Sequence, residues 1–301
     1  MQMGWVLVAV SSGAEARLGE LSETSVRAAG GTPNGWTCLS DTGPLHAGAL
    51  RFTAATEGLG VLRNALEAAG PIDAAILPAA RFGRKRLLIS DMDSTIIGQE
   101  CIDEIADAVG LKAKISEITE RAMRGELDFE AALTERVAML KGLPLGALAR
   151  TLEERITLNP GARTLIATMK AHGARTLLVS GGFTYFTSRV AELAGFESHQ
   201  GNTLIDDGAT LTGEVGRPIL GREAKRTALL EAAAALGASA EETLAMGDGA
   251  NDLDMIRASG LGVAYRAKPV VAAEAAGSIR HTDLTAALFF QGYKASEFVL
   301  D

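Results

Sequence analysis

Paired acidic residues follow a short apolar run a little less than a third of the way along the chain. Asp91 and Asp93 come directly after the apolar residues 87–90. Two carboxylates two positions apart on an extended chain point to the same side, and they repel each other unless a cation or a proton intervenes. Magnesium with oxygen ligands, acting on a phosphate, meets that need. The pair therefore favours Mg²⁺-assisted phosphate chemistry, with a turn capped by aspartate and serine as the alternative.

A serine and two glycines occupy the same kind of position after the apolar residues 175–179. Glycines at Gly181 and Gly182 let backbone N–H groups approach an anion, and the Ser180 hydroxyl can donate to a phosphate oxygen. An ordinary strand-to-helix turn has the same pattern. Lys225 lies near the start of another amphipathic segment, residues 223–236. It adds a cation if that end of the helix faces the site, although a lone lysine on a helix is usually solvated.

A third cluster, residues 247–252 (GDGAND), follows the apolar residues 243–246. Its oxygen-bearing side chains, Asp248, Asn251 and Asp252, suit a hard cation, whereas Asn251 alone would serve as a helix cap. Because three such clusters end three apolar segments, turn chemistry explains the set poorly.

The segments that would position these residues alternate between apolar runs and amphipathic stretches. Strands are predicted at 87–90, 175–179, 243–246 and 261–264, and helices at 161–171, 183–193, 223–236 and 253–258. This order predicts an α/β, Rossmann-like, doubly wound parallel sheet whose site lies at the carboxyl ends of its strands. Residues 100–155 are helical in pattern and too long for an ordinary connection, so they predict a cap after the first strand. Residues 202–213 contain Asp207-Gly208 and predict a hairpin.

The first 80 residues have a different texture and contain no cluster suggestive of chemistry. Their strands at 5–10, 36–39, 49–53 and 72–77 and helices at 14–29 and 58–69 give the βαββαβ order of a ferredoxin-like α+β domain. The basic residues 81–86 then read as a solvated connector. We therefore expect two domains, residues 1–80 and residues 81–301.

Composition excludes several classes of partner. The net charge of −8 and the lack of a Lys/Arg-rich run with aromatics argue against nucleic acid. No apolar run approaches the roughly 20 residues that span a bilayer, and residues 5–10 lack the flanks of a signal peptide. Cys38 and Cys101 are isolated and predict buried or half-buried free thiols in a reducing compartment. A cytoplasmic protein without membrane or nucleic-acid partners is expected.

In chain order, the four groups resemble the four motifs of the haloacid dehalogenase superfamily of phosphatases. They resemble its phosphoserine phosphatase branch in particular, through residues 91–95 followed by Glu100, residues 128–129 leading to 136–137, residues 179–183 and residues 247–252. The resemblance covers about residues 86–290. Some members of that branch carry an amino-terminal ACT-type domain, and residues 1–80 look like a divergent one.

This resemblance implies a role for each motif residue. Asp91 would be the nucleophile that becomes an aspartyl-phosphate, and Asp93 the general acid and then base. Mg²⁺ would be held by the Asp91 carboxylate, the Asp93 backbone carbonyl and Asp248, with Asp252 behind them. The groups facing the phosphate would be Ser180, the Gly181 amide, Lys225 and Asn251.

The implied substrate is O-phosphoserine, and the cap would read its amino-acid part. Glu100 suits the ammonium, Arg136 can bind the carboxylate bidentately, and Met123 and Phe129 would form an apolar lid. Each residue also has a structural reading: a helix N-terminal acid for Glu100, a surface position for Arg136 and cap packing for the other two.

Three functions remain open at this point. The first is phosphoserine hydrolysis in serine biosynthesis, the second is phosphoryl transfer to another acceptor such as homoserine, and the third is amino-acid sensing. The sequence also leaves open an amino-acid effector bound to residues 1–80 and a homodimer.

Overall fold

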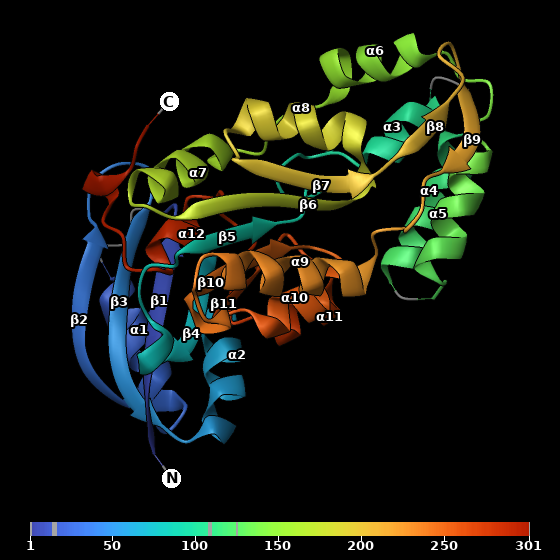
Figure 1. The fold of residues 1–301 in the computed structure, drawn as a ribbon. Coiled ribbons are helices and arrows are strands. Elements are labelled where there is room, and N and C mark those ends of the chain that lie inside the picture. The colour runs from blue at the N-terminus through green and yellow to red at the C-terminus, as the bar shows by residue number, and fades with distance from the viewer. Residues whose placement is uncertain (1, 14–16, 108–109, 125, 301) are drawn as a thin grey trace.

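The computed structural model describes residues 2–13, 17–107, 110–124 and 126–300 (Figure 1). The strands are β1 Met3–Ser11, β2 Thr32–Ser40, β3 His46–Ala54, β4 Ile72–Pro78, β5 Leu87–Ser90, β6 Arg175–Phe183, β7 Ser198–Asn202, β8 Leu204–Asp206, β9 Leu211–Val215, β10 Thr243–Gly247, β11 Leu261–Tyr265 and β12 Gly277–Ile279. The α-helices are α1 Leu18–Ala28, α2 Leu59–Ala69, α3 Cys101–Asp107, α4 Lys112–Met123, α5 Phe129–Ala138, α6 Leu145–Arg155, α7 Ala162–Ala171, α8 Thr184–Ala194, α9 Arg222–Ala235, α10 Leu253–Ala258, α11 Pro269–Glu274 and α12 Ala286–Phe289.

Ten of the strands form one sheet in the order β2-β3-β1-β4-β12-β11-β10-β5-β6-β7. From β12 to β7 every neighbouring pair is parallel, so the carboxyl ends of these strands share one edge. The central strand β5 is buried along its whole length and runs between β10 and β6, with Leu88 opposite Leu244 and Thr176. This is the doubly wound arrangement that the apolar runs predict.

Helices cover both faces of the parallel part. Helices α7, α8 and α12 pack on one face with the largest hydrophobic cluster, and α9, α10 and α11 pack on the other. Both layers come from stripes of apolar side chains at helical spacing, such as Leu165, Ile166 and Met169 on α7, all of which are fully buried. The layers leave the carboxyl edge of the strands open.

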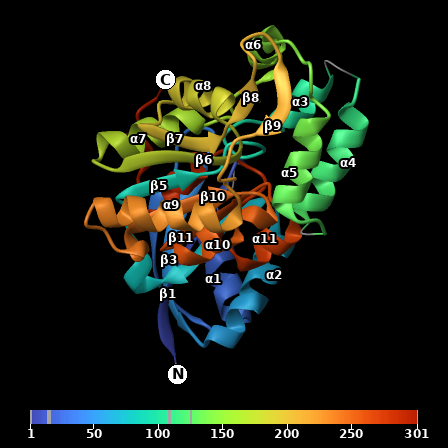
Figure 2. The ribbon, with the colours of Figure 1, turned by 45° about the vertical axis from the view of Figure 1, so that its right-hand side comes forward.

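Helices α3 to α6 form the predicted cap, and Figure 2 shows α4 and α5 beyond the ends of the strands. The two chain segments that enter and leave the cap run side by side, because Asn159 N donates to Ile96 O at 2.8 Å and Gly98 N to Thr157 O at 3.2 Å. The hairpin β8–β9, which the Asp207-Gly208 turn predicts, also joins the cap: Leu211 N donates to Leu143 O at 2.9 Å.

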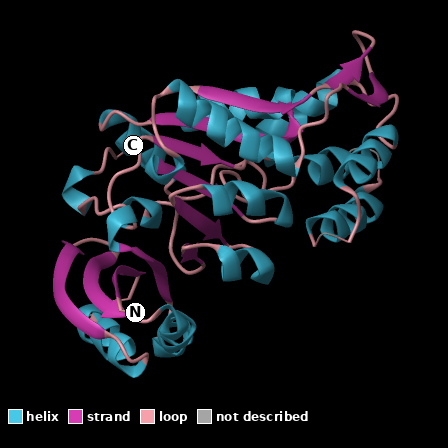
Figure 3. Ribbon diagram, turned by 60° about the horizontal axis from the view of Figure 1, so that its bottom comes forward, coloured by secondary structure: helices cyan, strands magenta, loops and turns pink. Residues whose placement is uncertain are grey.

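The amino-terminal strands β1 to β4 are antiparallel, and α1 and α2 lie on one face of them (Figure 3). The predicted βαββαβ order is confirmed, although residues 14–16 of its first helix lie outside the described ranges. This part is not a separate layer, because β4 pairs with β12 through Ala75 opposite Gly277 and Ala74 opposite Ser278. The division at residue 80 therefore crosses a continuous sheet and stays a prediction.

Several details differ from the sequence expectation. Strand β6 continues through the serine and glycines to Phe183, with a register irregularity after Val179, where the pattern suggested a turn. Strands β7 and β12 are additional; the first is polar and the second is three residues long, so neither has an apolar run. Cys38 is exposed and only Cys101 is buried. No helix in the described ranges is long and apolar enough to cross a membrane.

Candidate active site

The nucleophile loop leaves β5 at the middle of the carboxyl edge. Asp91 N donates to Met246 O at 2.9 Å, which ties the start of the loop to β10. The Asp91 carboxylate is buried and lies 2.8 Å from the ammonium of Lys225, whose side chain has no exposed surface. The helix end that carries Lys225 thus faces the site. A surface position, the usual place for a lone lysine, does not describe this residue.

Three carboxylates gather around that ammonium. Oxygen atoms of Asp91, Asp248 and Asp252 lie within 4.8 Å of one another, and all three residues are buried. Burial, then repulsion by Asp252, raises the pKa of Asp91 well above its ordinary value, although Lys225 lowers it. The same causes raise the pKa of Asp248 to about 7. Three carboxylates against one ammonium leave two negative charges when all are ionised, so the cluster suits a divalent cation with oxygen ligands.

Both carboxylate oxygens of Asp252 accept hydrogen bonds from other groups of the protein. Its Oδ2 accepts from Asp248 N at 3.1 Å and from Gly249 N at 3.0 Å, and its Oδ1 accepts from Lys225 at 2.7 Å. The Asp248 carboxylate makes fewer hydrogen bonds: among the described residues, its Oδ1 accepts only from the Thr95 hydroxyl, at 3.3 Å. Asp252 therefore braces the loop and the lysine.

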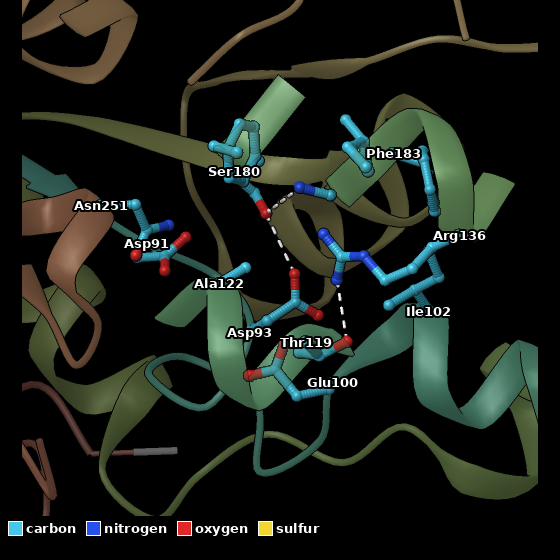
Figure 4. A pocket seen from close by; sticks show the side chains of 14 residues that line it. Asp91, Asp93, Glu100, Ile102, Thr119, Ala122, Arg136, Ser180, Phe183 and Asn251 are labelled. Carbon is cyan, nitrogen blue, oxygen red and sulfur yellow. Dashed lines mark hydrogen bonds between the residues drawn. The ribbon is translucent and has the colours of Figure 1, made fainter. Parts of the chain in front are cut away.

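Asp93 points away from this cluster. Its Oδ1 accepts from Cys101 N at 2.8 Å and its Oδ2 accepts from the Ser180 hydroxyl at 3.1 Å (Figure 4). Burial raises the pKa of Asp93, although the hydrogen bonds from Cys101 and Ser180 oppose the shift. A carboxyl group with a raised pKa that lines a pocket is suited to holding a proton.

The cap supplies the opposite wall. Asp128 begins α5 by accepting from Ala131 N at 2.8 Å. Phe129, Leu133 and Arg136 then follow at i, i+4 and i+7, so they share one helix face, and that face lines the pocket. Figure 4 shows Arg136 across the pocket from Asp91.

Arg136 is a buried cation that a cap network holds. Its Nη1 donates to the Thr119 hydroxyl at 2.8 Å and its Nε to Ala132 O at 3.1 Å. The Thr119 hydroxyl lies 3.0 Å from an oxygen of Asp103, to which it can donate. Burial lowers the pKa of Arg136, and Glu100 is the first of the acids that oppose this. The guanidinium therefore lacks a direct carboxylate partner in the described ranges and has room for one from a ligand.

Glu100 stands near Arg136 at the start of the cap. Its Oε1 accepts from the Ser94 hydroxyl at 2.6 Å. Burial, and next the charge of Asp93, raises the pKa of Glu100 well above its ordinary value. A bound ammonium would offset that repulsion. The cap side of the pocket thus contains one acidic side chain, Glu100, and one cationic side chain, Arg136, the pair that a zwitterionic ligand requires.

Phe129 closes the gap between cap and core. A Cβ added at Gly181 would lie 2.7 Å from the end of the Phe129 ring, so only glycine lets the ring rest on this loop. Asn251 lines the same pocket, and its Oδ1 is buried without a hydrogen-bond partner in the described ranges. Met123 ends α4, but its side chain lies outside what the structure describes.

Comparison with known proteins identifies the family. Residues 88–257 match the model of the haloacid dehalogenase-like hydrolases. A phosphoserine phosphatase of Albidiferax ferrireducens is 46% identical over 209 residues, which cover 68% of this chain and 88% of that protein. The chain belongs to the phosphoserine phosphatases of the haloacid dehalogenase-like hydrolase family.

Solved structures of this family extend the likeness to both parts of the chain. A hydrolase of the family from Salmonella enterica serovar Typhi has a TM-score of 0.79 at 32% identity, covering 96% of this chain and 98% of its own. A phosphoserine phosphatase solved as an analogue of its phospho-aspartyl intermediate has a TM-score of 0.66 at 37% identity, covering 69% and 99%. The first covers nearly the whole chain, the amino-terminal strands included, and the second covers about two thirds of it.

Most of the residues singled out in the sequence converge in this family's site. Those that line one pocket are Asp91, Asp93, Glu100, Phe129, Arg136, Ser180, Gly181 and Asn251. Lys225, Asp248 and Asp252 surround Asp91 from behind. Gly182 and Phe183, from the motif residues 179–183, line the pocket as well, whereas the sequence reasoning missed Ile102, Thr119, Ala122 and Leu133. Helical spacing offered a signal for two of them, because Thr119 precedes Met123 by four positions and Leu133 precedes Arg136 by three.

Proposed function

We propose that this chain hydrolyses O-phosphoserine to serine and phosphate through an aspartyl-phosphate on Asp91. One observation carries the substrate assignment: Glu100 and Arg136 line the same pocket as Asp91 and Asp93. An acidic and a cationic side chain are suited to the ammonium and the carboxylate of an amino acid. A generic phosphatase needs no such pair. The relatives named phosphoserine phosphatase support the same conclusion.

In the first step, an Asp91 oxygen attacks phosphorus in line while the bond from phosphorus to the serine oxygen breaks. A carboxylate nucleophile divides one difficult displacement into two easier ones. Lys225, 2.8 Å from Asp91 Oδ1, favours the ionised carboxylate and fixes its direction. Its charge also opposes the effect of burial and of Asp252, which raise the pKa of Asp91.

Asp93 acts as the proton carrier. The raised pKa of its carboxyl group, caused mainly by burial, favours the protonated acid at the start of the cycle. It donates that proton to the departing serine oxygen and then accepts one from the water that hydrolyses the aspartyl-phosphate. The hydrogen bonds from Cys101 N and Ser180 hold the carboxyl group facing the pocket during both transfers.

The donor set fits Mg²⁺, which the family resemblance implies. The residues that would hold it are Asp91, Asp248 and the backbone carbonyl of Asp93, with Asp252 acting through Lys225 and the loop amides that it binds. The ion, when bound, offsets the negative charge of the carboxylates and of the phosphoryl group.

Protein groups complete the phosphate subsite. Ser180, the Gly181 amide and Asn251 line the pocket beside Asp91, and their donors suit phosphoryl oxygens. In Asn251 the donor is the side-chain amide nitrogen, since the unpartnered Oδ1 can only accept a hydrogen bond. Since the transferring group spreads its charge over several oxygens, such donors act mainly by positioning and electrostatics.

The cap gives the substrate preference. Arg136 would bind the substrate carboxylate and Glu100 its ammonium, while Phe129, with Met123, would exclude water during transfer. The buried position of Arg136 makes its charge valuable to a ligand, because a desolvated ion pair is screened little.

A phosphate-release assay on the full chain tests the proposal. We expect turnover of O-phosphoserine with Mg²⁺, loss of turnover with a chelator, and much weaker turnover of phosphoethanolamine, which lacks the carboxylate. Added alcohol acceptors, including homoserine, distinguish hydrolysis from phosphoryl transfer. Faster turnover of a phosphorylated metabolite without an amino-acid part would contradict the substrate assignment.

Three expectations from the sequence stay predictions: an amino-acid effector at residues 1–80, a homodimer and a cytoplasmic location. The two-domain division also stays a prediction, because the sheet runs through both parts.

A further inference from the structure

Asn202 is a buried polar residue at the end of β7, and the proposed reaction makes no direct use of it. It pairs with Phe183 on β6, just beyond Ser180 and the two glycines. After Asn202 the chain leaves the core for the hairpin β8–β9, which reaches the cap (Figure 1). Asn202 itself lies outside the active-site pocket. A buried carboxamide needs hydrogen-bond partners, so its partners indicate what it does.

Three hydrogen bonds join the Asn202 side chain to two loops of the site. Its Nδ2 donates to Gly181 O at 2.8 Å and to Leu220 O at 3.1 Å, and its Oδ1 accepts from Leu220 N at 2.7 Å. Both N–H bonds of the carboxamide are therefore used, and its orientation is fixed, because only the nitrogen can donate to two carbonyl oxygens. The side chain thus links the loop of Ser180 and Gly181 to the segment before α9.

The first of these hydrogen bonds fixes the peptide group between Gly181 and Gly182. Its carbonyl oxygen accepts from Asn202, and its N–H donates to the Ser180 hydroxyl oxygen at 2.8 Å. A planar peptide group that is held at both ends keeps one orientation. The Ser180 hydroxyl donates its own hydrogen to Asp93 Oδ2, 3.1 Å away. Asn202 therefore acts on Ser180 and, through it, on the carboxyl group of Asp93.

The other two hydrogen bonds hold the segment that leads into α9. Leu220 precedes Gly221, from which the helix starts, and Lys225 N donates to Gly221 O at 3.2 Å in the first turn. The Lys225 ammonium in turn lies 2.8 Å from an oxygen of Asp91. Through Leu220, Asn202 thus constrains the helix end whose ammonium meets the nucleophile.

The two linked loops also form the surface on which the cap rests. A Cβ added at Gly181 would lie 2.7 Å from the Phe129 ring, and one added at Gly221 would lie 3.2 Å from it. The ring therefore contacts both loops at once, and it fits only while their separation stays constant. The Asn202 carboxamide, which bonds to both loops, keeps that separation.

We propose that Asn202 is a positioning residue for phosphoryl transfer, which holds the loop of Ser180 and Gly181 at a fixed distance from the start of α9. The donors of both segments then face the phosphoryl group together. Such donors matter most in the transition state, where misplacement by about 1 Å can cost about 100-fold in rate. This inference rests on the proposed phosphatase function. If Asn202 only closed the base of the hairpin segment, residues 203–219, its loss would lower stability without a selective loss of catalysis.

Kinetics and calorimetry on the full chain test the proposal with Asn202→Ala. We expect kcat for O-phosphoserine to fall by about 10- to 100-fold and KM to change by less than about threefold, because Glu100 and Arg136 still bind the amino-acid part. Orthovanadate, whose five-coordinate adduct resembles the transition state, should bind about tenfold or more weakly in the presence of Mg²⁺. Binding of L-serine should stay unchanged.

Gln291→Ala is the matched control. Gln291 is also a buried carboxamide that holds backbone groups, since its Oε1 accepts from Lys85 N at 3.0 Å and its Nε2 donates to Ala287 O at 2.9 Å. Lys85 precedes β5 at its amino end, away from the site. The control should lose stability but keep kcat and vanadate binding. Asn202→Ser, which keeps a hydroxyl donor, takes the place of Asn202→Ala if circular dichroism shows that the latter is unfolded.

A kcat for the folded Asn202 variant within about twofold of that for Gln291→Ala would overturn the proposal. So would a loss confined to KM, or weaker binding of L-serine with unchanged binding of vanadate, because Asn202 would then act on the cap. Binding of vanadate and L-serine is measured without turnover. A failure of the wild-type chain to hydrolyse phosphoserine is therefore distinguishable from a failure of this inference.

Discussion

Lys225 is the single ammonium among three buried carboxylates, and much of the site depends on it. Burial alone would lower its pKa, but Asp252 and Asp91 raise the pKa above its ordinary value. The lysine therefore stays charged and fixes the nucleophile, while two negative charges remain for a cation. Arg136 on the cap is likewise a buried charge, and we propose that its partner is the carboxylate of the substrate.

The raised pKa of Asp248, about 7 because of burial and Asp252, predicts pH-dependent metal binding. The proton must leave before Mg²⁺ binds, so affinity should fall by about tenfold per pH unit below about 7. Calorimetry at pH 6 and pH 8 measures this, and binding should release protons to the buffer. Equal affinity at both pH values would contradict the assignment, and Asp248→Asn is the control that should bind weakly at both.

The raised pKa of Asp248 also predicts how the stability of the metal-free protein changes with pH. The ordinary pKa of 3.8 applies to the unfolded chain, so the folded metal-free protein holds the proton over a wider pH range. Its folding should become less favourable as pH rises from about 4 to about 7, and Mg²⁺ should reverse that loss. Melting temperatures with and without Mg²⁺ across this range would record the effect.

Thr119 should affect specificity without touching phosphate. Thr119→Val removes the acceptor for Arg136 Nη1 at nearly constant volume. We expect kcat/KM for phosphoserine to fall by about 10- to 100-fold and that for phosphoethanolamine to change little. Thr119→Ser keeps the hydroxyl and should restore the preference. Equal losses on both substrates in folded Thr119→Val would show that the threonine supports the cap in general.

At the scale of elements, the predictable parts were those with strong local patterns. Strand β5 was predicted at its observed bounds because three apolar residues and a serine lie between the charged residues Arg86 and Asp91. The hairpin turn and the helical cap followed from turn chemistry and length. Strand β12 could not be predicted, because it is three residues long and owes its pairing to neighbours on both sides. The burial of individual side chains could not be predicted either, because no local pattern shows that Lys225 has no exposed surface.

The residues of the site also divide into those that a local pattern predicts and those that it does not. Its motif residues were predictable because they stand at the ends of recognisable strands, which meet at one edge of a parallel sheet. Helical spacing could place Thr119 on the same face as Met123, but the hydrogen bonds that join Thr119 to Arg136 and Asp103 were not predictable, since they arise from contact between α3, α4 and α5. Such contacts depend on how the cap helices pack, which single-sequence periodicity leaves undetermined.

At the scale of the whole molecule, the amino-terminal strands extend the catalytic sheet. Val6, Val8 and Val10 of β1 belong to the same buried cluster as Phe289 and Phe290 near the end of the chain. Asp73 adds a polar link, because its carboxylate accepts from three successive backbone amides and the Thr282 hydroxyl. The two parts should therefore unfold together, as a single cooperative unit.

Asp73→Ala tests this link. The variant leaves buried donors of residues 280–282 without an acceptor, so the free energy of unfolding should fall by about 3 kcal/mol. Turnover per folded molecule should stay unchanged, because Asp73 lies outside the active-site pocket. Denaturant titration gives the stability. A loss below about 1 kcal/mol, or two separate unfolding transitions, would contradict the account of one cooperative sheet.

The most direct test of the central claim is to locate the phosphate during turnover. The full chain is mixed with O-phosphoserine and Mg²⁺, quenched in acid, digested and analysed by mass spectrometry. We predict a phosphoryl group on Asp91 that hydroxylamine removes, and neither label nor turnover in Asp91→Asn. A phosphoryl group on another residue, or substantial phosphoserine turnover by Asp91→Asn in protein checked for deamidation, would contradict the aspartyl-phosphate mechanism.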